Sequence, residues 1–70
     1  MSIYGFCKAL RDEEEIPLSV INYSTSVGPR FWVYYGYAPP VAHGLTYTEA
    51  MTVVKAVAAT HRKIKREVAV

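Results

Sequence analysis

The sequence has few of the residues that cross-link very small proteins. Its 70 residues include one cysteine, Cys7, and two histidines, His43 and His61. One cysteine cannot form an internal disulfide, and structural zinc normally needs four cysteine or histidine ligands. Chains of this length bury only about 60% of their unfolded surface, so their small cores are often stabilised by oligomerisation. We therefore expect a homodimer or a complex with a larger protein, and no cofactor or metal.

Long apolar runs and a strong charge of one sign are also missing. No stretch approaches the roughly 20 apolar residues of a transmembrane helix. The N-terminus has no basic region followed by an apolar core, so we expect no signal peptide. The formal net charge of +2 is too small to indicate nucleic-acid binding by itself. Together with the single thiol, these absences predict a cytoplasmic protein without membrane contact.

Residues able to do chemistry do not form a recognisable catalytic pattern. A cysteine nucleophile needs an imidazole beside it, and nothing near Cys7 marks its thiol as activated. Cys7 falls at an apolar helical position, which favours a buried structural role, and His61 falls on the inner face of a predicted helix. The acidic run 12–15 has four adjacent carboxylates that do not converge on one ion, so a solvated linker is favoured. We expect no enzyme activity.

The longest regular pattern runs from Leu45 to Arg66 and predicts one helix. Thr46 as N-cap and Glu49 three residues later form a capping box. No glycine or proline follows Leu45. Apolar side chains then recur at steps of three and four, which places them on one helical face: Tyr47, Ala50, Met51, Val54, Val57, Ala58 and His61. The tail, residues 67–70, is either a frayed helix end or a short strand.

The N-terminal segment, residues 2–14, has a mixed pattern. Ser2 can cap a short helix, and four apolar residues then share one face: Ile3, Phe6, Cys7 and Leu10. Gly5 and the acidic run oppose a helix, because glycine destabilises its interior and carboxylates are unfavourable at its negative end. A strand over residues 2–10 is the alternative. We favour the helix.

Two β-prone segments follow the break at Pro17. Residues 18–25 and 30–38 are rich in β-branched and aromatic residues. Between them, Ser26–Pro29 supplies a loop of about four residues, which predicts an antiparallel hairpin. Residues 38–45 contain two adjacent prolines and predict an extended connector to the long helix.

Neither face of this hairpin is polar, and this is the most unusual property of the sequence. Alternation places Trp32, Tyr34 and Gly36 on one face. The other face then carries the remaining side chains of the second strand: Phe31, Val33, Tyr35 and Tyr37. One face must cover the long helix, which leaves the other for a partner or for water.

The free face predicts a partner-binding site. Tyrosine, tryptophan and arginine dominate the energetics of protein interfaces. On this basis we predict four partner-binding residues: Arg30, Trp32, Tyr34 and Tyr23. The alternative is that Trp32 belongs to the core and is packed by the N-terminal segment.

The basic residues near the end of the long helix predict a second, different surface. Arg62, Lys63 and Arg66 share one side of the helix and could contact phosphates. Two other interpretations compete with this nucleic-acid site. In one, the cations are stabilised at the negative end of the helix dipole; in the other, they contact the acidic run.

These patterns predict a single α+β domain over residues 1–70. It consists of a short N-terminal helix, an antiparallel hairpin and a long C-terminal helix packed on one sheet face, with a short terminal strand as an option. Its size, free cysteine, layout and missing catalytic residues resemble the small proteins with which phages and mobile elements modulate host machinery. We expect a non-enzymatic inhibitor that occludes a host protein. The alternative is a small nucleic-acid-binding protein that uses the basic helix end and the strand aromatics.

Overall fold

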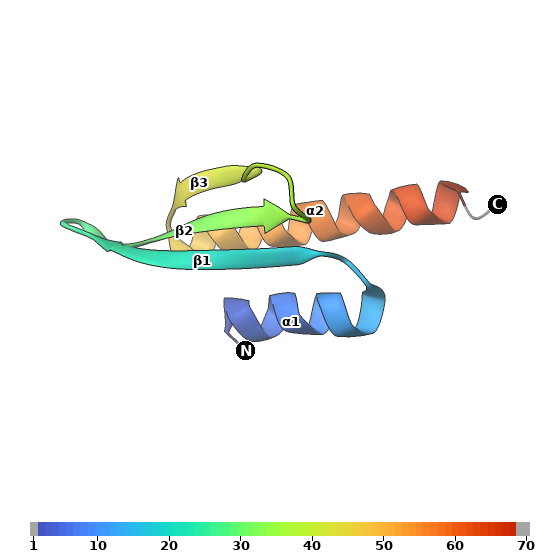
Figure 1. Ribbon diagram of the computed structural model, residues 1–70, viewed down its shortest axis with the longest axis horizontal. Coiled ribbons are helices and arrows are strands. Elements are labelled where there is room, and N and C mark those ends of the chain that lie inside the picture. Colours follow the sequence, from blue (N-terminus) through green and yellow to red (C-terminus); the bar gives the residue numbers. More distant parts are fainter. Residues whose placement is uncertain (1, 69–70) are drawn as a thin grey trace.

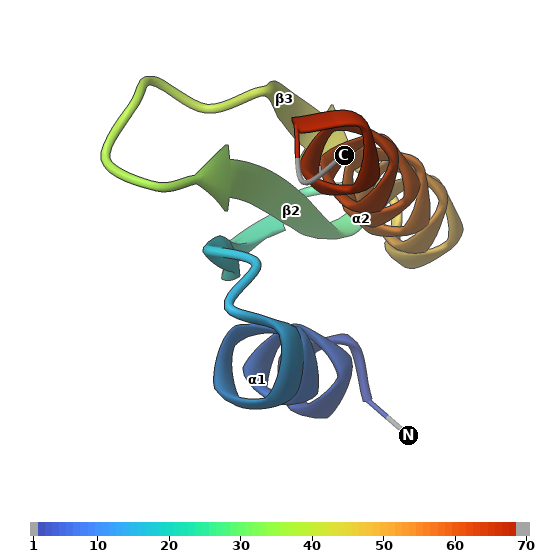
Figure 2. The ribbon, with the colours of Figure 1, turned by 90° about the vertical axis from the view of Figure 1, so that its right-hand side faces the viewer.

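The computed structural model describes residues 2–68. The chain forms α1 (Ile3–Glu14), β1 (Leu18–Thr25), β2 (Gly28–Tyr35), β3 (Ala42–Leu45) and α2 (Tyr47–Val68). The strands make one antiparallel sheet in the order β1-β2-β3. Figure 1 shows the arrangement of these elements, and in the view of Figure 2 both helices lie on the same side of the sheet. The predicted α+β fold is confirmed, with one strand more than expected.

Helix α1 confirms the helical interpretation of the N-terminal segment. Its cap is Ser2, whose hydroxyl accepts a hydrogen bond from the Gly5 N–H at 3.1 Å. Lys8 forms an ion pair with Asp12 at 2.6 Å, which offsets one carboxylate near the negative end of the helix. The strand alternative is therefore wrong. The linker interpretation of the acidic run is also wrong, because the last turn of α1 extends through Glu14.

Helix α2 begins at the predicted capping box. The Thr46 N–H donates to Glu49 Oε1 at 2.9 Å, and the Glu49 N–H donates to Thr46 Oγ1 at 3.3 Å. Leu45 belongs to β3 rather than to the helix. The helix continues to Val68, so the strand option is wrong for residues 67 and 68. Residues 69 and 70, the rest of that tail, lie outside the described residues.

The hairpin is tighter than the sequence predicted. Its turn contains only Ser26 and Val27, and Thr25 pairs with Gly28 across it. Gly28 has φ of +113°, a conformation that glycine adopts without strain. Pro29 lies inside β2, not in the loop. Because turn-flanking residues form a hydrogen-bonded pair, Pro29 falls in the next, non-hydrogen-bonded position and needs no N–H.

The second strand ends earlier than predicted, and its connector contains a third strand. Gly36 turns the chain with φ of +65°, and Tyr37 is fully exposed rather than on the inner sheet face. The Val41 N–H donates to the Val33 carbonyl at 2.9 Å, which begins the pairing of β3 with β2. Residues 38–45 are therefore only partly a connector.

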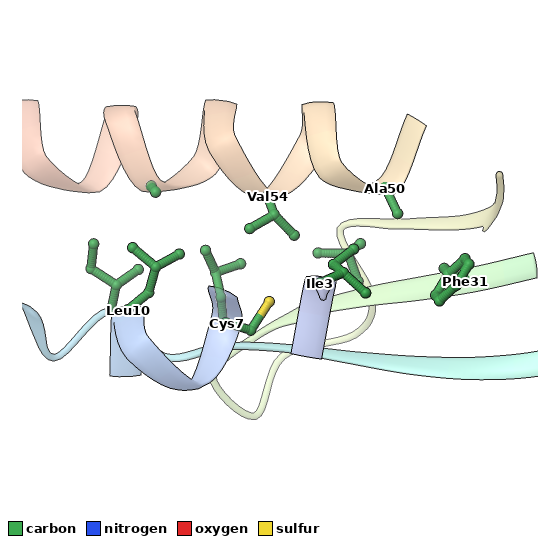
Figure 3. Packing of buried hydrophobic residues seen from close by; sticks show 10 residues of the cluster. Ile3, Cys7, Leu10, Phe31, Ala50 and Val54 are labelled. Atoms are coloured by element: carbon green, nitrogen blue, oxygen red, sulfur yellow. The ribbon is translucent and has the colours of Figure 1, made fainter. Parts of the chain in front are cut away.

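The core lies between the inner sheet face and the two helices (Figure 3). The predicted inner faces of α1, β2 and α2 all contribute to it. Alanines at two of the α2 positions allow the helix backbone to approach the sheet closely. The buried residues are Ile3, Cys7, Leu10, Ile16, Leu18, Phe31, Val33, Ala50, Val54 and Ala58. Within residues 2–68, neither helix has an apolar segment long enough to cross a membrane.

Candidate functional site

The outer face of the sheet carries a cluster of aromatic side chains. Trp32 lies at its centre, with ring centroids 6.0 Å from Tyr23, 6.4 Å from Tyr34 and 5.5 Å from His43. These separations fall within the range of favourable aromatic contacts. The cluster therefore joins all three strands into one surface. We call this surface the outer aromatic face; its residues are Ile21, Tyr23, Arg30, Trp32, Tyr34 and His43.

Strand register explains why these residues meet. Ile21 lies opposite Trp32, and Tyr23 lies opposite Arg30. Ile21 is 54% exposed and Tyr23 is 36% exposed. Among the described elements, α1 and α2 both pack on the inner face, so the outer aromatic face has no covering layer. An exposed apolar patch of this kind is characteristic of interaction surfaces.

Trp32 is a surface residue with a buried polar atom. Its neighbours Phe31 and Val33 point into the core, whereas the Trp32 side chain lies half-buried on the opposite face. The interpretation of Trp32 as a core residue under the N-terminal segment is therefore wrong. Its indole Nε1 is shielded from solvent and has no hydrogen-bond partner among residues 2–68. Buried tryptophan N–H groups usually have an acceptor, so this donor is left unsatisfied.

Arg30 is the one charged side chain among the described residues of the outer aromatic face. Its Nη1 donates to the Pro29 carbonyl at 2.9 Å, which holds the guanidinium near the hairpin end. The structure thus brings the four predicted partner-binding residues together on one surface: Tyr23, Arg30, Trp32 and Tyr34. Sequence reasoning did not place His43 there, because it did not predict β3.

The predicted nucleic-acid residues lie on another part of the molecule. Arg62 forms an ion pair with Glu14, so the alternative interpretation, a contact with the acidic run, is confirmed for this pair. The hydrogen bond from Arg62 lowers the pKa of the Glu14 carboxyl. Lys63 and Arg66 are exposed on the C-terminal turns of α2, which extend past the sheet (Figure 1).

Cys7 and the two histidines do not assemble into a catalytic group. Cys7 is 1% exposed in the core, and burial raises the pKa of its thiol despite the nearby charge of Arg11. His43 lies on the outer aromatic face, on the other side of the sheet. His61 lies on α2 beside β2, and its Nδ1 is 2.6 Å from Tyr35 Oη. Residues 2–68 contain no cluster of three potential metal ligands.

A groove beside α2 was not predicted from the sequence. It has a volume of about 360 Å³ and lies between α2 and the chain around β2 and β3. The signal that could have revealed it is Ile64, which extends the apolar stripe of α2 beyond the part covered by the sheet. The lining residues are Tyr35, Val41, Ala56, Val57, Thr60, His61 and Ile64.

Comparisons with sequence profiles of protein families, with characterised proteins and with solved structures gave no significant match. No family or relative therefore assigns a role to the outer aromatic face.

Proposed function

We propose that the protein is a non-enzymatic protein-binding module that docks through its outer aromatic face. The observation that carries this proposal is the contiguous aromatic surface around Trp32, on the sheet side opposite both helices. Tyrosine and tryptophan bury a large area at a low cost in side-chain entropy. Trp32 and Tyr34 are the central anchors, and Arg30 contributes a charged hydrogen-bond donor at the edge.

The unsatisfied indole of Trp32 supports the same proposal. A buried donor without an acceptor destabilises the free protein by about 1–3 kcal/mol. A backbone carbonyl of the partner that reached Nε1 would satisfy this donor. Binding would thus remove a cost that the free chain carries, which favours a partner with an exposed polypeptide segment.

The proposed mechanism is steric occlusion of a host protein, as in the small phage and mobile-element modulators that the sequence resembles. A standard interface covers about 800 Å² on each partner. That area is roughly a sixth of the 4817 Å² surface of the described chain. The partner must therefore cover the whole outer aromatic face rather than one ring, and nothing else could occupy that part of the partner.

Nucleic-acid binding is the second candidate, because bases can stack on sheet aromatics and cations can contact phosphates. The two requirements are met on different surfaces here. The outer aromatic face contributes Arg30 alone among described charged residues, whereas Lys63 and Arg66 lie at the far end of α2. This separation is the reason that a protein partner ranks first.

The proposal is tested by affinity capture from host lysate with three immobilised chains: wild type, Trp32→Ala and Tyr37→Ser. Tyr37 is fully exposed and is not among the described rings that contact Trp32, so its variant is the matched control. A protein retained by wild type and Tyr37→Ser but lost with Trp32→Ala is the expected result. Equal retention by all three chains would contradict the proposal.

Two further measurements separate the competing occupants of the outer aromatic face. Sedimentation of the purified chain tests the predicted homodimer, in which a second copy would cover this face. Binding to mixed DNA and RNA across a salt series tests the nucleic-acid candidate. Micromolar affinity with a steep salt dependence would replace the protein-only interpretation.

A further inference from the structure

Helix α2 carries an apolar stripe that extends beyond the end of the sheet on which the helix packs. Its last buried residue is Ala58, and every residue of 62–68, here called the overhang, is exposed. Figure 1 shows these turns extending beyond the strands. The stripe nevertheless continues at steps of four, three and four, the spacing with which one helix packs against another. Its members are Val57, His61, Ile64 and Val68.

The stripe forms one wall of the groove beside α2. Ile64 is 55% exposed and Val41, on the opposite wall, is 49% exposed. A further hollow of about 300 Å³ continues the groove along the overhang, past Lys65 to Val68. At the floor, Tyr35 Oη and His61 Nδ1 are hydrogen-bonded to each other. The side chains left for a ligand are mainly aliphatic.

The charge beside this groove is positive. Lys65 lines the hollow that continues the groove, and Lys63 and Arg66 lie on the same turns of α2, together with one carboxylate, Glu67. Among residues 2–68, none of these three cations has a carboxylate within ion-pair distance. Arg62 is different, because Glu14 already neutralises it. An apolar ligand with acidic flanks would match both the groove and its rim.

We propose that the groove is a second docking site, which binds an amphipathic helix of a partner protein. The docking helix would place apolar residues at steps of three and four against Val57 and Ile64. An acidic residue on its flank would face Lys65. This mode, a helix laid in an apolar groove, gains affinity from apolar burial and orientation from charge.

The other occupants fit less well. A second copy of the overhang would bring like charges together at Lys65. Helix α1 of a second copy has no free apolar stripe, since Ile3, Cys7 and Leu10 are buried in its own core. A nucleic acid would contact the cations but would leave Ile64 uncovered.

The groove lies on the helix layer, and the outer aromatic face lies on the opposite side of the sheet. Two partner segments could therefore be held at once, as in an adaptor. The groove proposal does not depend on the function proposed for the outer aromatic face. Either site can fail without the other.

The test is a titration of the isotopically labelled full chain, followed by NMR, with two synthetic helical peptides of about 18 residues. Both carry leucine at steps of three and four; one has glutamate at the flanks and the other has lysine. We expect the glutamate peptide to shift the amide signals of Val57 and Ile64. The lysine peptide should bind at least about tenfold more weakly. The indole signal of Trp32 should stay unchanged.

Three variants make the result specific. Ile64→Ser should weaken the glutamate peptide by about tenfold or more, whereas Val27→Ser at the exposed hairpin tip should have no effect. Lys65→Glu should weaken the glutamate peptide and strengthen the lysine peptide. All three positions are exposed, so each variant should keep the circular dichroism spectrum of the wild type.

Several results would overturn the proposal. Equal affinity for the two peptides would show that charge does not contribute to binding. Signal changes confined to Trp32 would show that the peptide binds the outer aromatic face instead of the groove. A wild-type dimer that Ile64→Ser converts to a monomer would assign the groove to a second copy. Mixed-sequence DNA that shifts the same amides, when the glutamate peptide does not, would assign the surface to nucleic acid.

Discussion

Glu14 and Arg62 join the ends of the two helices through a double hydrogen bond. Arg62 Nε and Nη2 each donate to a different carboxylate oxygen of Glu14, both at 2.7 Å, across 48 positions of sequence. Carboxylates are unfavourable at the C-terminal end of a helix, and the guanidinium of α2 offsets this charge at the end of α1. Arg62, which the sequence predicted as a possible nucleic-acid contact, thus connects α2 to α1.

Replacing Glu14 with Gln should lower stability at neutral pH. The hydrogen bond from Arg62 lowers the folded-state pKa of Glu14 below its ordinary value of 4.5. Because the folded-state pKa is lowered, the contribution of this carboxylate to stability is complete above the unfolded-state pKa. It is lost as pH falls through the folded-state pKa. The difference in urea midpoint between wild type and Glu14→Gln should therefore shrink as pH falls from about 7 to about 3.

The pair is tested by a double-mutant cycle with Arg62→Gln. If the two side chains act mainly on each other, the double variant should be no less stable than the less stable of the two single variants. Losses that simply add would show that the pair has no coupling.

Glu15 should be improved by glycine. Its φ of 58° is left-handed, a conformation that costs a residue with a Cβ about 1 kcal/mol. Glu15→Gly should raise the free energy of unfolding by up to about 1 kcal/mol, partly offset by the greater freedom of glycine in the unfolded chain. Glu15→Ala keeps the Cβ and should not raise the free energy of unfolding. Urea denaturation of both variants decides this, and a glycine variant no more stable than the alanine one would count against it.

Val54 should be the most sensitive position of α2. It is fully buried between the helix and the inner sheet face. Val54→Ala should cost about 2 kcal/mol through lost packing, and Val54→Asp should unfold the chain by burying an unpaired charge. Lys55→Ala, one residue along on the exposed side, should change stability by less than about 0.5 kcal/mol. Circular dichroism during thermal unfolding checks all three, and a native-like Val54→Asp would reject the assigned helix face.

The Cys7 thiol should be unreactive while the chain is folded. It is 1% exposed, and burial raises its pKa above the ordinary value of 9.0. Since the thiolate is the nucleophile, alkylation should be at least about a hundredfold slower in the folded chain than in urea. Because the unfolded chain releases the thiol proton at a lower pH than the folded chain, the free energy of unfolding should fall as pH rises from the unfolded-state pKa to the folded-state pKa of Cys7. Equal alkylation rates in the two states would contradict the buried position.

The elements that the sequence predicted well are those with local signals. The capping box of Thr46 and Glu49 needs only four consecutive residues, and it marks the start of α2 correctly. Alternation in β2 needs only its own residues, and it separates Trp32 from Val33 correctly. These signals do not depend on how the rest of the chain packs.

The missed elements depend on contacts between distant residues. Strand β3 has four residues and includes Gly44, so its own propensity is weak, and pairing with β2 creates it. Its absence from the prediction explains why His43 was not placed beside Trp32. The groove was missed for a similar reason, since the end of the sheet decides which part of the α2 stripe is covered.

The most direct test of the protein-binding proposal uses Trp32 as a reporter, because it is the only tryptophan in the chain. Its fluorescence therefore comes entirely from the outer aromatic face. With a captured partner that lacks tryptophan, or whose tryptophans are replaced, we predict a changed emission maximum and reduced quenching by acrylamide on binding. Tyr34→Ala should weaken that binding by about 2 kcal/mol, or roughly thirtyfold. Binding of the partner with unchanged Trp32 emission and unchanged quenching would contradict the proposal.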